Sequence, residues 1–204
     1  MAATALTISR MQQELFACED HLPQGFVYQQ AFLTLAEELT LLDCIRALPL
    51  SEARYKQFTA RRRTVSYGSQ YDFDVNTLMS APSIPPFLEP LRHKVADWIG
   101  LQPQQFVQAL VSEYRPGAPL GWHRDVPQYD SIVGVSLGGP CVMRLRPYKP
   151  GEKQVRRSVV SLALAPRSAY SIRGSARWDW QHSIVATKAL RYSITLRTAR
   201  SARA

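Results

Sequence analysis

The sequence predicts a mainly β protein of the α+β class, in which a β-sandwich or jelly-roll core follows N-terminal helices. Short runs rich in β-branched and aromatic residues follow one another from Phe106 onward, between clusters of Pro and Gly. Two earlier segments instead space their apolar residues three and four positions apart. The 204 residues, 46% of them hydrophobic, suffice for one substantial core. We therefore expect a single domain over residues 1–204, with its helical part at about 24–100 and its β-rich core at about 106–198.

Both helices are predicted from apolar stripes. The first lies within residues 32–48 and is ended by Pro49, and its stripe consists of Leu35, Leu39, Leu42, Ile45 and Leu48. The second runs over residues 88–99 and is ended by Gly100, and its stripe consists of Leu91, Val95, Trp98 and Ile99. The connection between them, SAPSIPPFLEP, is short and apolar, so we place no domain boundary there.

Strands are predicted in the segments 106–114, 131–139, 141–146, 158–166, 168–173, 182–186 and 190–198. The last one alternates strictly, with Leu190, Tyr192, Ile194 and Leu196 on one face and Arg191, Ser193, Thr195 and Arg197 on the other. The apolar face predicts contact with the core. If the other face lines a barrel interior, its two arginines need anionic partners, which a small dicarboxylate would provide. The alternative is an exposed face with solvated arginines.

A metal site is predicted from two histidines and one aspartate. His123 and Asp125 lie two residues apart in GWHRD, so on a strand their side chains would project from the same face. His182, inside another expected strand, is the candidate for a third ligand. Two imidazoles and one carboxylate form the ligand set of non-haem Fe(II) oxygenases. A His-x-Asp pair alone is weak evidence, and the arginines of the last strand strengthen it.

The charge of the chain favours a polyanionic partner. Lys and Arg outnumber Asp and Glu by 25 to 16, which gives a net charge of +9, although a basic surface also serves solubility. Candidate nucleic-acid contacts are Arg61, Arg62 and Arg63 for phosphate and Tyr67, Tyr71 and Phe73 for base stacking. The alternatives are a solvated face for the arginines and core packing for the aromatic residues. Trp122 is expected either over the metal cavity or in the packing around it. The basic loop 149–157 is expected either to bind phosphate or only to keep the protein soluble.

Cysteine usage and the N-terminal sequence predict a soluble protein of the cytoplasm. Cys18, Cys44 and Cys141 are odd in number and far apart, which favours neither a disulfide framework nor a zinc site. The first residues lack a secretory pattern, and no segment reaches the roughly 18 apolar residues of a membrane span. We expect a monomer.

Four motifs together resemble the AlkB family of Fe(II)- and 2-oxoglutarate-dependent dioxygenases. They are VSEYRPGAPLGWHRD, IVGVSLGGPCVMRLRP, WQHSI and RYSITLRT, in family order over about residues 106–198. Upstream, RRRTVSYGSQYDF and APSIPPFLEPL resemble the substrate lid and the following helix of bacterial members. The resemblance implies a double-stranded β-helix with metal ligands at one mouth and helices against its outer sheet.

The resemblance also implies roles for single residues. His123, Asp125 and His182 match the iron ligands, Arg191 matches the partner of the distal carboxylate of 2-oxoglutarate, and Arg197 matches the second arginine of the family signature. Tyr114 matches a tyrosine that holds the co-substrate, with Ser112 and Ser193 beside it, where other members often carry Asn. Pro127 stands where repair members often carry an acidic residue that contacts the alkylated base.

The expected function is oxidative demethylation of N-alkylated bases in DNA or RNA, with consumption of O2 and 2-oxoglutarate and release of formaldehyde, succinate and CO2. The departure at Pro127 leaves a second reading, the same chemistry on a protein side chain or a small molecule. A third reading is a non-catalytic module that binds nucleic acid. The complete ligand set disfavours this third reading.

Overall fold

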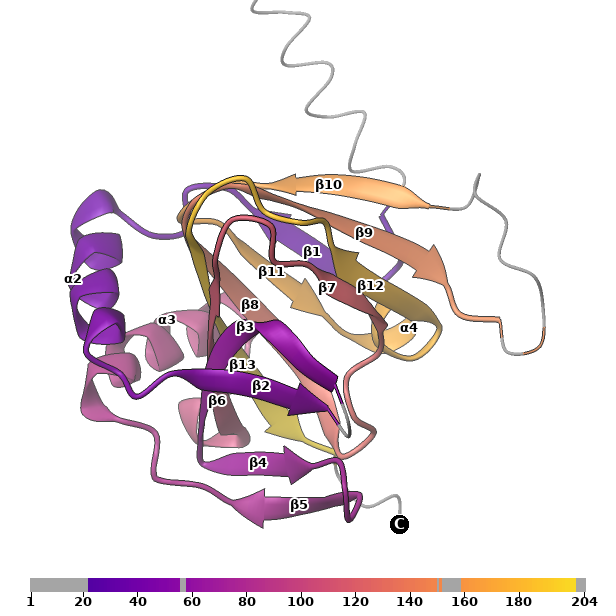
Figure 1. The fold of residues 1–204 in the computed structure, drawn as a ribbon, viewed down its shortest axis with the longest axis horizontal. Helices are drawn as coiled ribbons and strands as arrows, with labels where there is room; N and C mark the ends of the chain where they lie inside the picture. Colours follow the sequence, from indigo (N-terminus) through magenta and orange to yellow (C-terminus); the bar gives the residue numbers. More distant parts are fainter. Residues whose placement is uncertain (1–21, 56–57, 150, 152–158, 201–204) are drawn as a thin grey trace, which may run out of the picture.

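The computed structural model describes residues 22–55, 58–149, 151 and 159–200. Cys18 and three residues of the basic loop, Lys153, Arg156 and Arg157, therefore lie outside the described residues, as does the start of the strand expected at 158. In the described part, two antiparallel sheets face each other and two helices pack beside the larger sheet (Figure 1). This arrangement confirms the predicted mainly β jelly roll with N-terminal helices.

The larger sheet contains seven described strands in the order β1 (Phe26–Gln29), β11 (Ala169–Ile172), β8 (Tyr129–Gly138), β13 (Arg191–Ala199), β6 (Phe106–Tyr114), β3 (Phe58–Tyr67) and β2 (Ser51–Tyr55). The smaller sheet has the order β10 (Val160–Leu164), β9 (Cys141–Pro147), β12 (Trp180–Ile184) and β7 (Leu120–His123). A separate hairpin joins β4 (Ser69–Asp72) and β5 (Thr77–Ser80). Each of the seven predicted strands overlaps an observed strand, and β12 begins two residues before its predicted start.

Helix α2 (Leu35–Arg46) begins at a reciprocal cap. The Thr34 hydroxyl accepts a hydrogen bond from the Glu37 N–H, and the Glu37 carboxylate accepts one from the Thr34 N–H at 2.7 Å. Such a capping box pairs backbone donors that a helix start would otherwise leave free. The helix predicted within residues 32–48 is thus confirmed, with a defined first residue.

The apolar stripe predicted for this helix is wrong at its N-terminal end. Leu35 and Leu39 are 58% and 49% exposed, whereas Glu38 is buried in their place. The Glu38 carboxylate accepts hydrogen bonds from the Gly138 N–H at 2.9 Å and from Arg167 at 3.0 Å. Because both of its oxygens find donors on other segments, the helix can turn a charged residue inward and a leucine outward.

Helix α3 (Glu89–Ile99) follows a single 3-10 turn at Pro86–Leu88. It ends at Gly100, whose φ of 68° is the left-handed conformation that glycine adopts without strain, as predicted. Leu91 and Val95 are buried against the outer face of the larger sheet. None of the helices in the described part of the chain is long and apolar enough to cross a membrane.

Strand β13 separates two interiors. Tyr192, Ile194 and Leu196 join the core between the larger sheet and the helices, as the alternation predicted. Leu190 was assigned to the same face, but it precedes the strand and is largely exposed. The opposite face of β13 looks toward the smaller sheet, where a second core surrounds a cavity. Of the two alternatives for the arginine face, the structure thus shows the one in which this face lines an interior.

Candidate active site

A cavity between the two sheets brings the candidate residues together. It is lined by Arg62, Leu110, Ser112, Tyr114, Leu120, His123, Asp125, Ile132, Met143, Tyr170, His182, Ile184, Arg191, Ser193, Thr195 and Arg197. The set contains all eight residues that were predicted to hold a metal or a co-substrate. Seven of them come from strands β6, β7, β12 and β13 of the two sheets, and Asp125 comes from the loop that follows β7.

The three predicted metal ligands form one cluster. His123 ends β7 directly opposite His182 of β12, and their ring centroids are 4.2 Å apart. One ligand atom from each histidine and one carboxylate oxygen of Asp125 all lie within 4.8 Å of one another. The three side chains can thus contact a single ion.

The path by which Asp125 reaches this cluster differs from the prediction. Strand β7 ends at His123, so the two ligands do not alternate along one strand. Asp125 lies in the loop that follows, and its carbonyl oxygen accepts a hydrogen bond from buried Arg177 at 3.1 Å instead of pairing with another strand. The same guanidinium nitrogen also donates to the carbonyl oxygens of Val126 at 2.8 Å and Tyr129 at 2.9 Å. Arg177 therefore fixes the loop that carries the carboxylate.

The protonation states suit a metal ligand set. Burial lowers the pKa of His182 to about 3 and also lowers the pKa of His123, so both imidazoles are neutral at pH 7. Burial alone would raise the pKa of Asp125, but Arg197 and the two imidazoles hold that pKa well below its usual range. The Nδ1 of His123 lies 2.9 Å from the Gly121 carbonyl oxygen, which can only accept, so Nε2 is left as the ligand atom. Two neutral imidazoles and one carboxylate fit Fe(II).

Arg191 carries the second part of the site. Its side chain is 1% exposed, its Nε donates to the Ser136 hydroxyl at 3.1 Å, and its guanidinium lies 4.8 Å from the centre of the Tyr114 ring. One terminal nitrogen, Nη1, is buried and has no partner among the described residues. A buried cationic donor without a partner is costly, so this pocket fits the carboxylate of a small molecule such as 2-oxoglutarate.

Two further residues at this pocket were not found from the sequence. Ser136 of β8 lies directly opposite Ser193 of β13, and Tyr170 of β11 lies opposite Gly134 of β8. A Cβ atom at Gly134 would be 2.2 Å from the Tyr170 ring, so only glycine lets this ring lie across the strand and line the cavity. The pairing of distant strands brings both residues to the pocket, and this pairing cannot be predicted from any single segment of the sequence.

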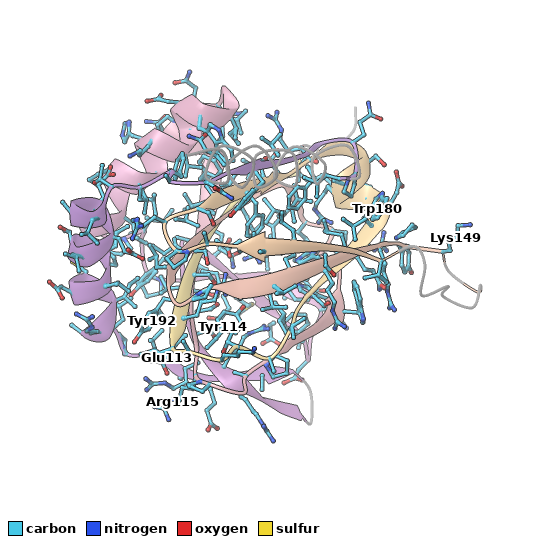
Figure 2. The ribbon with its side chains drawn as sticks, turned by 90° about the horizontal axis from the view of Figure 1, so that it is seen from above. Glu113, Tyr114, Arg115, Lys149, Trp180 and Tyr192 are labelled. Atoms are coloured by element: carbon cyan, nitrogen blue, oxygen red, sulfur yellow. The ribbon has the colours of Figure 1, made fainter. Side chains whose placement is uncertain are left out.

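The arginine run on β3 divides among three environments. Arg63 donates two hydrogen bonds to the buried carboxylate of Glu113, at 2.9 and 2.7 Å, and so is not a free phosphate contact. Glu113 also accepts from Arg115 at 3.1 Å, beside Tyr192 (Figure 2). Arg62 lines the cavity, and Arg61 is exposed. Of the three arginines, only Arg61 therefore remains a candidate phosphate contact on the surface, because Arg62 lies in the cavity that holds the metal cluster.

The aromatic candidates also separate. Tyr67 is buried in the core between the larger sheet and the helices, which is the packing alternative. Tyr71 and Phe73 contact each other edge to face with ring centroids 4.9 Å apart, in the hairpin of β4 and β5. Trp122 does not line the cavity, because it neighbours His123 on β7 and faces the other way. Its ring lies under the guanidinium groups of Arg144 and Arg146 at 5.1 and 4.3 Å.

Comparison with known proteins gives curated relatives that share part of their length with this chain. An Arabidopsis thaliana protein described as an alkylated DNA repair protein ALKBH8 homolog is 30% identical over 173 residues, which covers 75% of this chain and 48% of the relative. Uncharacterized protein L905 of Acanthamoeba polyphaga mimivirus is 35% identical over 79 residues, which covers 38% of this chain and 35% of the relative. The chain thus spans half or less of the length of the curated relatives it matches.

The fold and the family are covered more completely. The solved structure of OsALKBH1 matches with a TM-score of 0.66 at 15% identity, over 87% of this chain and 99% of that one, which shows a shared fold. Residues 26–200 match the 2OG-Fe(II) oxygenase superfamily, a range that contains helices α2 and α3, both sheets and the whole cavity. The chain therefore belongs to the 2OG-Fe(II) oxygenase superfamily, as an AlkB-like member.

Proposed function

We propose that this chain is an Fe(II)- and 2-oxoglutarate-dependent dioxygenase that demethylates N-alkylated bases in DNA or RNA. The observation that carries the proposal is one cavity that holds both the cluster of His123, Asp125 and His182 and the guanidinium of Arg191, whose Nη1 has no partner among the described residues. The first group fits the metal, and the second fits the distal carboxylate of the co-substrate.

In this proposal His123, Asp125 and His182 would hold Fe(II), and three protein ligands would leave room for small molecules to bind it. When bound, Fe(II) and 2-oxoglutarate supply the oxidising chemistry: with O2 they yield succinate and CO2, and the remaining oxygen atom enters a C–H bond of the substrate. An N-methyl group oxidised in this way becomes N-hydroxymethyl, which releases formaldehyde and restores the N–H bond. The net reaction is demethylation.

The remaining residues orient the two reactants. Arg191 is buried in the cavity wall, held by Ser136 and stacked against Tyr114, and would anchor the distal carboxylate of 2-oxoglutarate. Ser112 and Ser193 line the same wall and offer hydroxyl groups to this molecule. Arg197 holds one oxygen of Asp125 and so keeps the carboxylate ionised and aimed at the metal position.

Two observations support a nucleic acid as the substrate. The net charge of +9 suits a polyanion, and the Arabidopsis relative is described as an alkylated DNA repair protein homolog. Pro127 favours keeping a second candidate, a methylated protein side chain or small molecule, because it provides no carboxylate beside the metal cluster.

The test combines purified protein with Fe(II), ascorbate and 2-oxoglutarate, and measures succinate and formaldehyde against methylated DNA, methylated RNA and methylated peptides. We expect formaldehyde from oligonucleotides and none from peptides. Formaldehyde from peptides alone would assign the second substrate class. If the protein binds oligonucleotides but forms no succinate under any condition, the oxygenase proposal is contradicted and the non-catalytic nucleic-acid-binding module is favoured.

A further inference from the structure

Three guanidinium groups line the cavity, and they differ in the partners that the described residues give them. Arg197 is bonded to Asp125, and Arg191 is bonded to Ser136 at the end where the co-substrate carboxylate fits. Arg62 forms no ion pair with any described residue, and its Nε is buried without a hydrogen-bond partner. Its charge also acts on His123, whose pKa it helps to lower. Arg62 is therefore a cation beside the metal cluster without an ion-pair partner among the described residues.

The strand register places Arg62 on the same face of the larger sheet as Arg191, in a more exposed position. Arg191 of β13 pairs with Tyr114 of β6, and Tyr114 pairs with Arg62 of β3, so the three side chains form a row across the larger sheet. Arg191 is almost fully buried, whereas Arg62 is half-buried and lies on β3, the second strand from the sheet edge. A molecule that approaches the metal cluster after 2-oxoglutarate has bound meets Arg62 and not Arg191.

The charged groups of the loaded site leave an excess of positive charge. Asp125 pairs with Arg197, and the two charges of Fe(II) equal those of the two carboxylates of 2-oxoglutarate, so that Arg191 and Arg62 each add one further positive charge. The Nε of Arg62 has no acceptor among the described residues, and Pro127, two residues after Asp125, has no side-chain oxygen. An excess of positive charge in a partly buried cavity disfavours a cationic ligand and favours one that offers Arg62 an acceptor.

We propose that Arg62 selects the substrate by charge, favouring an alkylated base that is uncharged and presents a carbonyl oxygen over an alkylated base that carries a positive charge. This inference rests on the proposed oxygenase function and names its substrate class. A methyl group on N3 of cytosine produces a cation at neutral pH. A methyl group on N3 of uracil replaces a proton and leaves a neutral ring with two carbonyl oxygens. The two bases have nearly the same shape, so a difference in their binding reports the effect of the charge of the base and not of its steric fit.

The test is a binding comparison of two single-stranded RNA oligonucleotides that differ only in one base, 3-methyluracil or 3-methylcytosine. Fluorescence anisotropy is measured under nitrogen with Mn(II) and 2-oxoglutarate present, so that binding is observed without turnover. For the unaltered protein we expect about tenfold tighter binding of the 3-methyluracil strand, which corresponds to about 1.4 kcal/mol. Formaldehyde release from both strands is then measured in air with Fe(II).

The variants assign the preference to Arg62. Arg62→Gln should bring the ratio of the two dissociation constants close to one, and Arg62→Glu should invert it in favour of the cation. Arg61→Gln is the matched control, because it removes the same charge from the adjacent exposed position and should keep the tenfold ratio. The dissociation constant of 2-oxoglutarate and the melting temperature of each variant verify that the site remains folded.

Equal binding of the two strands by the unaltered protein, no binding of either, or an unchanged ratio in Arg62→Gln would overturn the inference. A loss of 2-oxoglutarate affinity in Arg62→Gln as large as in Arg191→Gln would also overturn it, since Arg62 would then belong to the co-substrate. Failure of the proposed function is a different result. In that case neither strand yields formaldehyde, whereas the binding ratio and its dependence on Arg62 persist.

Discussion

The Nε of Arg197 lies 2.8 Å from Oδ1 of Asp125, and this bond joins the two sheets at the metal cluster. Arg197 belongs to β13 of the larger sheet, and Asp125 follows β7 of the smaller one. The other carboxylate oxygen, Oδ2, lies 3.7 Å from Nε2 of His182. One oxygen is thus held by the protein, and the second is directed at the position where a metal would bind.

Replacement of Arg197 should therefore damage folding and metal binding together. Arg197→Ala leaves Asp125 buried without its cation, and we expect a loss of about 3 kcal/mol in the free energy of unfolding. Urea denaturation measures it. The matched control is Arg46→Ala, which breaks an exposed ion pair with Asp43 and should cost less than about 1 kcal/mol. Equal losses in the two variants would contradict the role of the bond.

The stability of the metal-free protein should fall as the pH is lowered from about 6.5 toward 3. Burial lowers the pKa of His182 from its ordinary 6.5 to about 3, so the unfolded chain binds a proton in this range that the folded chain does not. Each such proton costs about 1.4 kcal/mol per pH unit. Urea unfolding of chelator-treated protein at several pH values measures the slope. His182→Gln should make this dependence on pH less steep. Equal slopes in the unaltered protein and in the variant would contradict the prediction.

Arg191 should control the affinity for 2-oxoglutarate. Arg191→Gln removes the buried cation that faces the carboxylate, and we expect the KM for 2-oxoglutarate to rise by about 100-fold or more, since losing one partner of a buried charge pair costs about 3 to 5 kcal/mol. Ser136→Ala, which removes only the bond that positions Arg191, should raise this KM less. An unchanged KM in Arg191→Gln would remove Arg191 from the co-substrate site.

Arg177 should act on the metal through the loop that carries Asp125. Arg177→Met keeps the bulk of the side chain but loses its bonds to three backbone carbonyl oxygens, and we expect the affinity for Mn(II) to fall about 10- to 100-fold. Arg177→Lys should recover part of this loss. The dissociation constant of 2-oxoglutarate at saturating metal should stay unchanged. A variant that binds Mn(II) normally would show that the loop holds its shape without Arg177.

The sequence allowed the fold and the inner ligand set to be predicted because both depend on local patterns. The alternation of side chains along residues 191–197 is a local property of the strand and is retained in the folded sheet. Two histidines with one aspartate are a ligand set typical of non-haem Fe(II). Residues 35 and 39 were misplaced because the inward direction of Glu38 depends on donors about 100 and 129 residues away. The cross-strand neighbours of Arg62, Ser136 and Tyr170 likewise depend on register between distant strands.

The most direct test of the central claim is the stoichiometry of succinate and formaldehyde released from a methylated oligonucleotide, compared between the unaltered protein and Asp125→Ala. If one cavity holds the metal at Asp125 and the co-substrate at Arg191, the two products should form in a ratio of about one to one, since each oxidation consumes one 2-oxoglutarate, and both should disappear in Asp125→Ala. Formaldehyde release by Asp125→Ala at the rate of the unaltered protein, or release without succinate, would contradict the account.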